Sequence, residues 1–184
     1  MTLMIDQLRR EHEGLVALLR VLERQAAVLA EAAGTPDTEA LAALAEYFTD
    51  YPQQVHHPKE DLIWRALKAR DRSAAAAIGD IESEHRHLME LTHDVAAAIN
   101  AILRDAEVRR DAAAQVVRRF VDAERRHIEK EEKLFFPAAA RTLKAEDWAE
   151  IAARAGQRQD PLASTAADER FAALRRMIAQ GTDS

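Results

Sequence analysis

The sequence predicts an all-α protein, an up-and-down four-helix bundle with one or two extra C-terminal helices. Three observations predict this class. Gly and Pro number only five each among 184 residues, and apolar residues recur at helical spacing along almost the whole chain. The third observation is that the segments between the predicted helices are short, and short connections join antiparallel neighbours in a bundle.

Four long helices are expected, with residues 3–32, 36–70, 73–104 and 108–143 as their bounds. Thr35 is expected to cap the second helix, with Pro36 at its first position, where a missing N–H costs least. Pro52 and Pro58 predict a kink or a short break in this helix, and Pro137 predicts a kink near the end of the fourth. Residues 1–143 would then form the bundle.

The C-terminal residues 144–184 are expected to form a helical extension packed on the bundle. Two shorter helices are predicted there, at about 146–155 and 165–180, each followed by a glycine. Trp148, Leu162 and Phe171 are the side chains expected to hold the extension in place. It contains no histidine, and no chemistry is assigned to it.

Composition excludes several classes of protein. The formal charge of −6 is mild and its carriers are interspersed, so no basic stripe for nucleic acid is present. No apolar run approaches the roughly 18 residues of a membrane span, and the N-terminus lacks the apolar core of a signal peptide. We therefore expect a cytoplasmic protein, a monomer or a homodimer. The absence of cysteine excludes thiolate catalysis, iron–sulfur clusters and cysteine zinc sites.

A repeated pattern of histidine and glutamate relates the two halves of the chain. His56-x-x-x-Glu60-Asp61 recurs 71 residues later as His127-x-x-x-Glu131-Glu132. The other two helices share Glu-His-x-x-Leu, which begins at Glu11 and again, 73 residues later, at Glu84. Each half thus contributes a single histidine and then a His-x-x-x-Glu pair, which predicts a pseudo-symmetric site.

The spacing of these residues suits a pair of metal ions. Positions i and i+4 of a helix share a face, so one imidazole and one carboxylate can reach the same ion. The histidines also share faces with apolar residues, as His127 does with Phe120 and Leu134, so the imidazoles are expected to point into the core. The predicted metal ligands are His12, His56, Glu60, His85, His127 and Glu131.

In the predicted centre, Glu60 and Glu131 bridge two metals, and each metal has two terminal histidines. Nitrogen and oxygen ligands with open positions favour iron, then manganese, and zinc would accept the same donors. No catalytic residue is expected beyond the metal site.

The remaining histidines leave one alternative open. His57 pairs with Asp61 at i+4 just as His56 pairs with Glu60, so the register could be shifted by one residue. The match between the two halves favours His56 as the ligand. His57 is then expected behind the ligands, or as a substitute ligand, or in solvent. His87 and His93 have no counterparts and are expected at the surface.

A competing pattern is the ferritin-like di-iron arrangement, in which Glu-x-x-His occurs on two helices. Glu82-x-x-His85 and Glu124-x-x-His127 fit it, but it would leave His12 and His56 unused. The charged residues near the end of the fourth helix are expected to form a solvated face; these are Glu129, Lys130, Glu132 and Lys133.

The chain resembles the hemerythrin-like, or HHE cation-binding, family over roughly residues 5–140. The resemblance rests on His12 and on the segments 56–61, 82–85 and 127–137. It implies two iron ions joined by carboxylates and by an oxo or hydroxo bridge. The oxygen carriers of the family use a fifth histidine, four residues after the one on the third helix, where this chain has Met89. The set of four His and two Glu is more similar to the stress-related branch, which includes iron–sulfur repair and peroxide-decomposing proteins.

The expected function is that of a non-haem di-iron protein that binds and reacts with dioxygen, hydrogen peroxide or nitric oxide in oxidative or nitrosative stress. The repair role is less well matched, because the cysteine-bearing segment of the repair proteins is absent. The alternative is a non-enzymatic sensor of oxygen or iron, or an iron-binding module.

Overall fold

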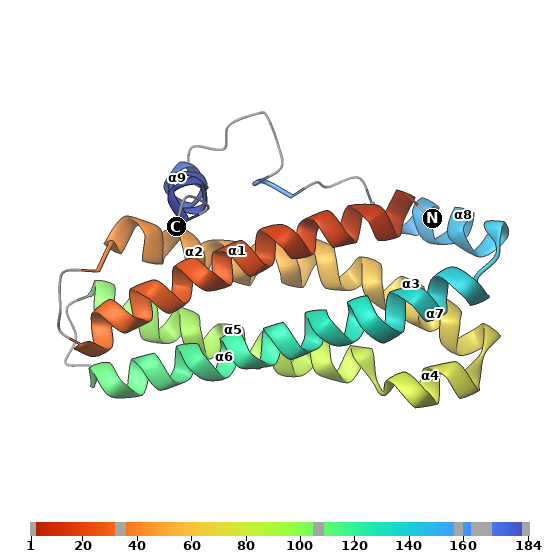
Figure 1. The fold of residues 1–184 in the computed structure, drawn as a ribbon, viewed down its shortest axis with the longest axis horizontal. Coiled ribbons are helices and arrows are strands. Elements are labelled where there is room, and N and C mark those ends of the chain that lie inside the picture. Colours follow the sequence, from red (N-terminus) through yellow and green to blue (C-terminus); the bar gives the residue numbers. More distant parts are fainter. Residues whose placement is uncertain (1–2, 32–35, 105–108, 157–159, 163–170, 182–184) are drawn as a thin grey trace.

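The described secondary structure is entirely helical, as predicted. The computed structural model describes residues 3–31, 36–104, 109–156, 160–162 and 171–181 (Figure 1). The elements are α1 (Leu3–Glu31), α2 (Thr38–Tyr51), η1 (Pro52–His56), α3 (His57–Arg70), α4 (Arg72–Ile78), α5 (Ile81–Leu103), α6 (Arg110–Lys130), η2 (Glu131–Phe135), α7 (Phe136–Thr142), α8 (Ala145–Arg154) and α9 (Ala172–Gly181), where η1 and η2 are π-helical turns.

Four long rods lie side by side along the long axis of the molecule (Figure 1). The first is α1, the second runs from α2 through η1 into α3, the third is α4 with α5, and the fourth runs from α6 through η2 into α7. Successive rods run in opposite directions. The helix α1 packs on α6, α6 on α5, α5 on α2 and α2 on α1, which closes the set around a common interior.

The second and fourth rods each widen by one residue immediately before a proline. The N–H of His57 donates to the carbonyl of Pro52, five residues back, and Pro58 follows. In the same way, the N–H of Phe136 donates to the carbonyl of Glu131, and Pro137 follows. Because proline has no N–H and crowds the preceding turn, a wider turn accommodates it without breaking the rod.

The wide turns change which side chains face inward. Both of the adjacent residues Phe135 and Phe136 are fully buried. Leu134 is 50% exposed, so the predicted inward position of this residue is wrong. The prediction assumed regular α-helical rotation per residue, which a π-turn does not keep.

Two predicted helix boundaries differ from the structure. The third rod was expected as one helix, but it breaks at Gly79, whose φ of +97° is left-handed, and Asp80 caps α5 through its side chain and the N–H of Ser83. The second rod is capped by Asp37, whose carboxylate accepts from the N–H of Ala40 at 3.0 Å, and not by the predicted Thr35, which lies outside the described residues.

The hydrophobic core forms two clusters. The larger lies among α1, α2, α5 and α6 and includes Leu19, Phe48 and Phe120. The smaller lies toward α3 and α7 and includes Trp64 and Phe135. Among the described helices, none combines the length and the apolar composition that a bilayer crossing requires.

The C-terminal extension packs on the rods through the three predicted side chains. Trp148 packs against the smaller cluster, Phe171 belongs to the larger one, and Leu162 packs against it. Asp160 adds a buried polar anchor, because its carboxylate accepts from the Tyr47 hydroxyl at 3.1 Å. The predicted helices at 146–155 and 165–180 correspond to α8 and α9, and residues 163–170 lie outside the described residues.

Two glycines provide a matched test of this backbone. Gly79→Ala should lower the free energy of unfolding by about 1 kcal/mol, because a Cβ is strained at positive φ. Gly14→Ala, inside α1, should raise it by roughly 0.5–1 kcal/mol, because the added Cβ meets its nearest atom, Oδ2 of Asp160, at an ordinary 3.8 Å. Urea denaturation of the two variants measures both changes. Equal effects of the two substitutions would contradict the assigned conformations.

Candidate metal centre

The six predicted ligands and one further histidine converge between the four rods. His12 comes from α1, His85 from α5 and His127 from α6, while the second rod supplies both His56 and Glu60. Glu131 comes from the wide turn η2. The further histidine is His57, the first residue of α3. All seven side chains are buried.

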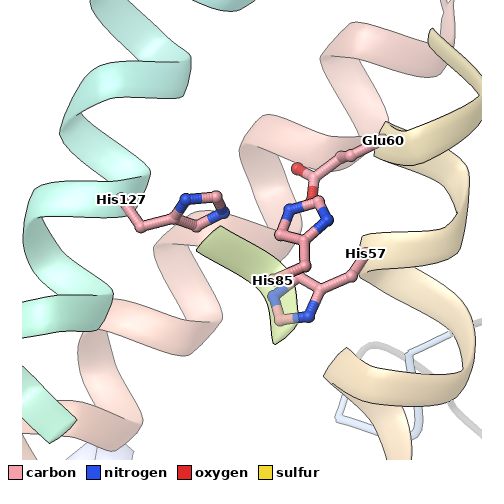
Figure 2. A group of neighbouring side chains, drawn as sticks. All are labelled: His57, Glu60, His85 and His127. Atoms are coloured by element: carbon pink, nitrogen blue, oxygen red, sulfur yellow. The ribbon is translucent and has the colours of Figure 1, made fainter. Parts of the chain in front are cut away.

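The seven residues form two groups, each with its ligand atoms within 4.8 Å of one another. One group is His12, His56, Glu60 and Glu131, and the other is His57, Glu60, His85 and His127. Figure 2 shows the second group, with side chains from three different rods pointing toward a common space. Glu60 belongs to both groups.

The two carboxylates lie between the two sets of imidazoles. Oε1 of Glu60 is 3.1 Å from Nε2 of His56, and its Oε2 is 3.5 Å from Nε2 of His85. Oε2 of Glu131 is 3.2 Å from Nε2 of His12, and its Oε1 is 3.3 Å from Nε2 of His127. Each carboxylate therefore presents one oxygen to each side, which is the arrangement that a bridging carboxylate needs.

The donor atoms at the centre of the cluster fit metal ions. Both oxygens of Glu60 and of Glu131, both ring nitrogens of His57, and Nε2 of His12, His85 and His127 are buried without a hydrogen-bond partner. A buried polar group without a partner costs free energy, and a buried charge costs more. Cations that accept imidazole nitrogen and carboxylate oxygen remove this cost, and iron, manganese and zinc all do so.

Four carboxylates outside the cluster orient the predicted histidines. Each histidine donates from Nδ1 to one carboxylate: His12 to Glu132 at 2.9 Å, His56 to Glu11 at 2.7 Å, His85 to Asp61 at 2.7 Å and His127 to Glu84 at 3.1 Å. This hydrogen bond fixes the tautomer that leaves Nε2 free for a metal, and it makes the imidazole a stronger ligand.

Cations pair with these outer carboxylates in turn. Lys59, itself buried, donates to Glu11 at 3.3 Å, and Lys130 donates to Glu84. The hydrogen bond and the charge of His56, helped by the ammonium of Lys59, outweigh burial and lower the pKa of Glu11 to about 2. Arg9 donates to Glu132 at 2.9 Å.

Sequence reasoning missed these outer residues. Lys130 and Glu132 were expected on a solvated face, and the structure shows that both take part in the chains of hydrogen bonds around the centre. The signal was in the repeat, because Glu11 and Glu84 each precede a single histidine, and Asp61 and Glu132 each follow a glutamate of the repeated pair.

His57 lies inside the cluster, so of the three positions expected for it, behind the ligands, as a substitute ligand or in solvent, only the position in solvent is wrong. It is 3% exposed and stacks on His85, with ring centroids 4.2 Å apart (Figure 2). His56 and His57 both reach the centre because they lie at the junction of the wide turn and α3, next to Pro58. The structure therefore brings a fifth imidazole to the cluster from the second rod, and Met89 of the third rod is 39% exposed.

Burial and charge shift the pKa values of the cluster in opposite directions. Burial alone would lower the pKa of His56, but the charge of the nearby Glu60 carboxylate and the hydrogen bond to Glu11 raise it to about 9. In the same way, the hydrogen bond to Asp61 and the nearby carboxylates of Glu131 and Glu60 overcome burial and raise the pKa of His85 to about 9. Burial and the neighbouring His85 lower the pKa of His57.

The ferritin-like arrangement does not match the structure. Glu82 accepts from Arg65 at 2.6 Å and from Lys68 at 3.3 Å, away from both groups of candidate ligands. Glu124 is buried but belongs to neither group. His87 and His93 are exposed, as predicted.

Comparison with known families gives one result. The family model described as Hemerythrin HHE cation binding domain matches residues 3–139 and again residues 76–180. No curated protein and no solved structure matched the chain.

The raised pKa values predict how the metal-free chain responds to pH. His56 and His85 hold protons in the folded state up to about pH 9, whereas in the unfolded chain they lose them near the ordinary 6.5. The folded state therefore binds more protons between pH 6.5 and 9, and the free energy of unfolding should fall as the pH rises through this range. His57, with its lowered pKa, acts in the opposite direction and only below pH 6.5.

Denaturant midpoints of the chelated protein at pH 6.5 and 9.5 measure this effect. His93→Ala, at an exposed position, should leave the difference between the two midpoints unchanged, and His56→Ala should reduce it. Equal midpoints for the unsubstituted chain at the two pH values would contradict the prediction. Metal affinity should rise over the same range, because protons compete with metal for the imidazoles.

Proposed function

We propose that the chain, which belongs to the hemerythrin HHE cation-binding family, is a non-haem di-iron protein that binds and reacts with dioxygen, hydrogen peroxide or nitric oxide. In this proposal, residues 1–143 form an up-and-down four-helix bundle, and residues 144–184 extend it. The observation that supports the proposal best is the pair of buried donor groups that share Glu60. A role in oxidative or nitrosative stress is proposed from the four His and two Glu of the repeat and from Met89, which stands where the oxygen carriers of the family have their fifth histidine.

In this proposal, Glu60 and Glu131 would hold both metals, since each presents one oxygen to each side. His12 and His56 would hold one metal, and His57, His85 and His127 would hold the other. The ligand set is then five imidazoles and two carboxylates, one histidine more than the repeat alone predicts. When bound, a pair of irons would supply redox electrons and an open coordination position for a small ligand.

The outer carboxylates hold the imidazoles in place for this role. Each fixes one ring through Nδ1, so the four Nε2 atoms are oriented before a metal arrives. The positive partners of the carboxylates keep them ionised. An ionised outer carboxylate accepts from Nδ1 of its histidine and leaves Nε2 of the same ring for a metal. This order of cation, carboxylate and imidazole therefore favours metal binding.

Aromatic side chains exclude water from one side of the centre. Phe136 stacks on His12 with ring centroids 5.4 Å apart, and Phe135 packs against it and against Trp64. All three aromatic side chains are buried. This apolar wall limits the entry of water and of stray protons to a ligand held at the centre.

The first test is metal content and optical spectroscopy of the purified chain. We expect about two iron ions per chain and charge-transfer bands near the ultraviolet edge that change when azide is added. Elemental analysis and absorption spectra measure both. A chain loaded under anaerobic conditions with ferrous iron that retains none after gel filtration would contradict the proposal. Turnover of hydrogen peroxide by the loaded chain would separate a reactive centre from a sensor.

A second test concerns the fifth imidazole. His57→Ala should weaken binding of one of the two metals by roughly tenfold or more, because loss even of a group behind the ligands costs about that much. His93→Ala is the matched control and should bind both metals as the unsubstituted chain does. Titration with ferrous iron or cobalt, followed optically, measures the two affinities. Unchanged binding by His57→Ala would remove this residue from the ligand set.

A further inference from the structure

A groove in the surface of the protein reaches one of the candidate ligands. It has a volume of about 470 Å³, which is in the usual range for small-molecule pockets, and it lies where α1 meets η2. All but the last of its lining residues belong to α1: Arg9, His12, Glu13, Val16, Ala17, Arg20 and Glu132. Because His12 belongs to the first group of candidate ligands, the groove and the centre share a side chain.

The imidazole of His12 connects the groove with the inside of the centre. Its Nδ1 donates to Oε1 of Glu132 at 2.9 Å, and Glu132 lines the groove. Its other ring nitrogen, Nε2, lies 3.2 Å from Oε2 of Glu131 and 3.4 Å from Oε1 of Glu60. The same ring therefore contacts a wall of the groove and both central carboxylates.

The groups beside His12 in the groove are partly open to solvent. Arg9 donates to Oε2 of Glu132 at 2.9 Å, and the two side chains are 32% and 31% exposed. Ion pairs as exposed as this contribute little to stability, so they separate readily. By contrast, Glu11 and Lys59, which pair behind the second histidine of this group, are 5% and 3% exposed. The groups behind His12 can therefore move aside, whereas those behind the second histidine are packed into the fold.

Two other grooves of the described surface do not reach the centre. One lies between α3 and α8 and has a volume of about 230 Å³, and the other lies beside α3 and α4 and has a volume of about 700 Å³. Neither is lined by any of the seven candidate ligands. Phe136, which stacks on one face of the His12 ring, does not line the groove beside His12. Of these three grooves, only the one beside His12 gives a small molecule access to a ligand.

We infer that this groove is the entrance through which the small ligand reaches the metal centre, past the ring of His12. The inference rests on the proposed function and adds to it a route from solvent. Two guanidinium groups and two carboxylates line the groove, so their formal charges cancel. The chemical class that such an entrance suits is a small neutral polar molecule, of which hydrogen peroxide is an example.

The first test fills the groove without changing its charge. Ala17 is half-buried and lines the groove, and Ala66, the matched control, is half-buried and lines the groove between α3 and α8. In the full iron-loaded chain, Ala17→Phe should slow both the association and the dissociation of azide by about tenfold, and Ala66→Phe should leave both rates unchanged. Stopped-flow absorption measures the two rates.

The equilibrium affinity distinguishes a blocked route from a damaged centre. An obstacle in the route raises the barrier and leaves the free and bound states as they are, so the dissociation constant for azide should stay within about twofold in both variants. Azide is a suitable probe although it is charged, because neither substitution changes the charge of the groove.

A second pair of variants blocks the groove after the protein has folded. The chain contains no cysteine, so Ala17→Cys and Ala66→Cys each introduce a single thiol. The azide rates of each iron-loaded variant are measured before and after alkylation of the thiol with a bulky maleimide. Alkylation should slow azide exchange about tenfold in Ala17→Cys and should not change it in Ala66→Cys. This comparison decides the question if Ala17→Phe does not fold.

Three outcomes would overturn the inference. The first is an unchanged azide rate after alkylation of Ala17→Cys, and the second is an equal slowing in the Ala66 variants. The third is slower association with unchanged dissociation, which would mean that the substitution weakens binding at the centre and does not block a route. An unsubstituted chain that binds no iron overturns the proposed function and this inference together, whereas loaded variants that exchange azide at unchanged rates overturn this inference alone.

Discussion

The burial of five imidazoles and two carboxylates at one level of the helical rods is the constraint on which the rest of the structure depends. A charge buried without compensation costs several kcal/mol, which is a large part of the stability of a domain of this size. Opposite charges, arranged in layers around the centre, compensate this cost. Glu60 and Glu131 lie at the centre, imidazoles surround them, carboxylates such as Glu11 bond the imidazoles, and cations such as Lys59 bond those carboxylates.

The repeat accounts for these layers as well as for the candidate ligands. Glu11 and Glu84 occupy equivalent positions, and each accepts a hydrogen bond from the histidine of the His-x-x-x-Glu pair in its own half. Lys59 and Lys130 are also equivalent, and each pairs with the outer glutamate of its own half. A short segment of each helix thus supplies a ligand and the group that holds another ligand. His56 and His127 are held within their own halves, whereas Glu132 holds His12 and Asp61 holds His85 across the two halves.

The sequence was sufficient to predict the helical class and the six residues that meet at the centre, because helical spacing and the repeat determine which face each residue occupies. It was not sufficient for His57 or Leu134, because both lie at wide turns where rotation per residue changes and regular spacing no longer applies. Glu132 and Lys130 were misjudged for another reason. A run of alternating charges indicates a solvated face, and only the position of α1 and α5 beside α6 shows that His12 and Glu84 take these side chains as partners.

The difference between the two halves of the centre can be traced to two adjacent residues. His57-Pro58 in the second rod corresponds to Ile128-Glu129 in the fourth, where α6 continues as a regular helix. Pro58 is accommodated by the wide turn η1, and that turn lets the neighbouring His56 and His57 both face the interior. A centre with equivalent halves would have the same number of imidazoles on both sides. The proline and its wide turn therefore account for the three imidazoles in the group of His85 and His127, compared with two in the group of His12 and His56.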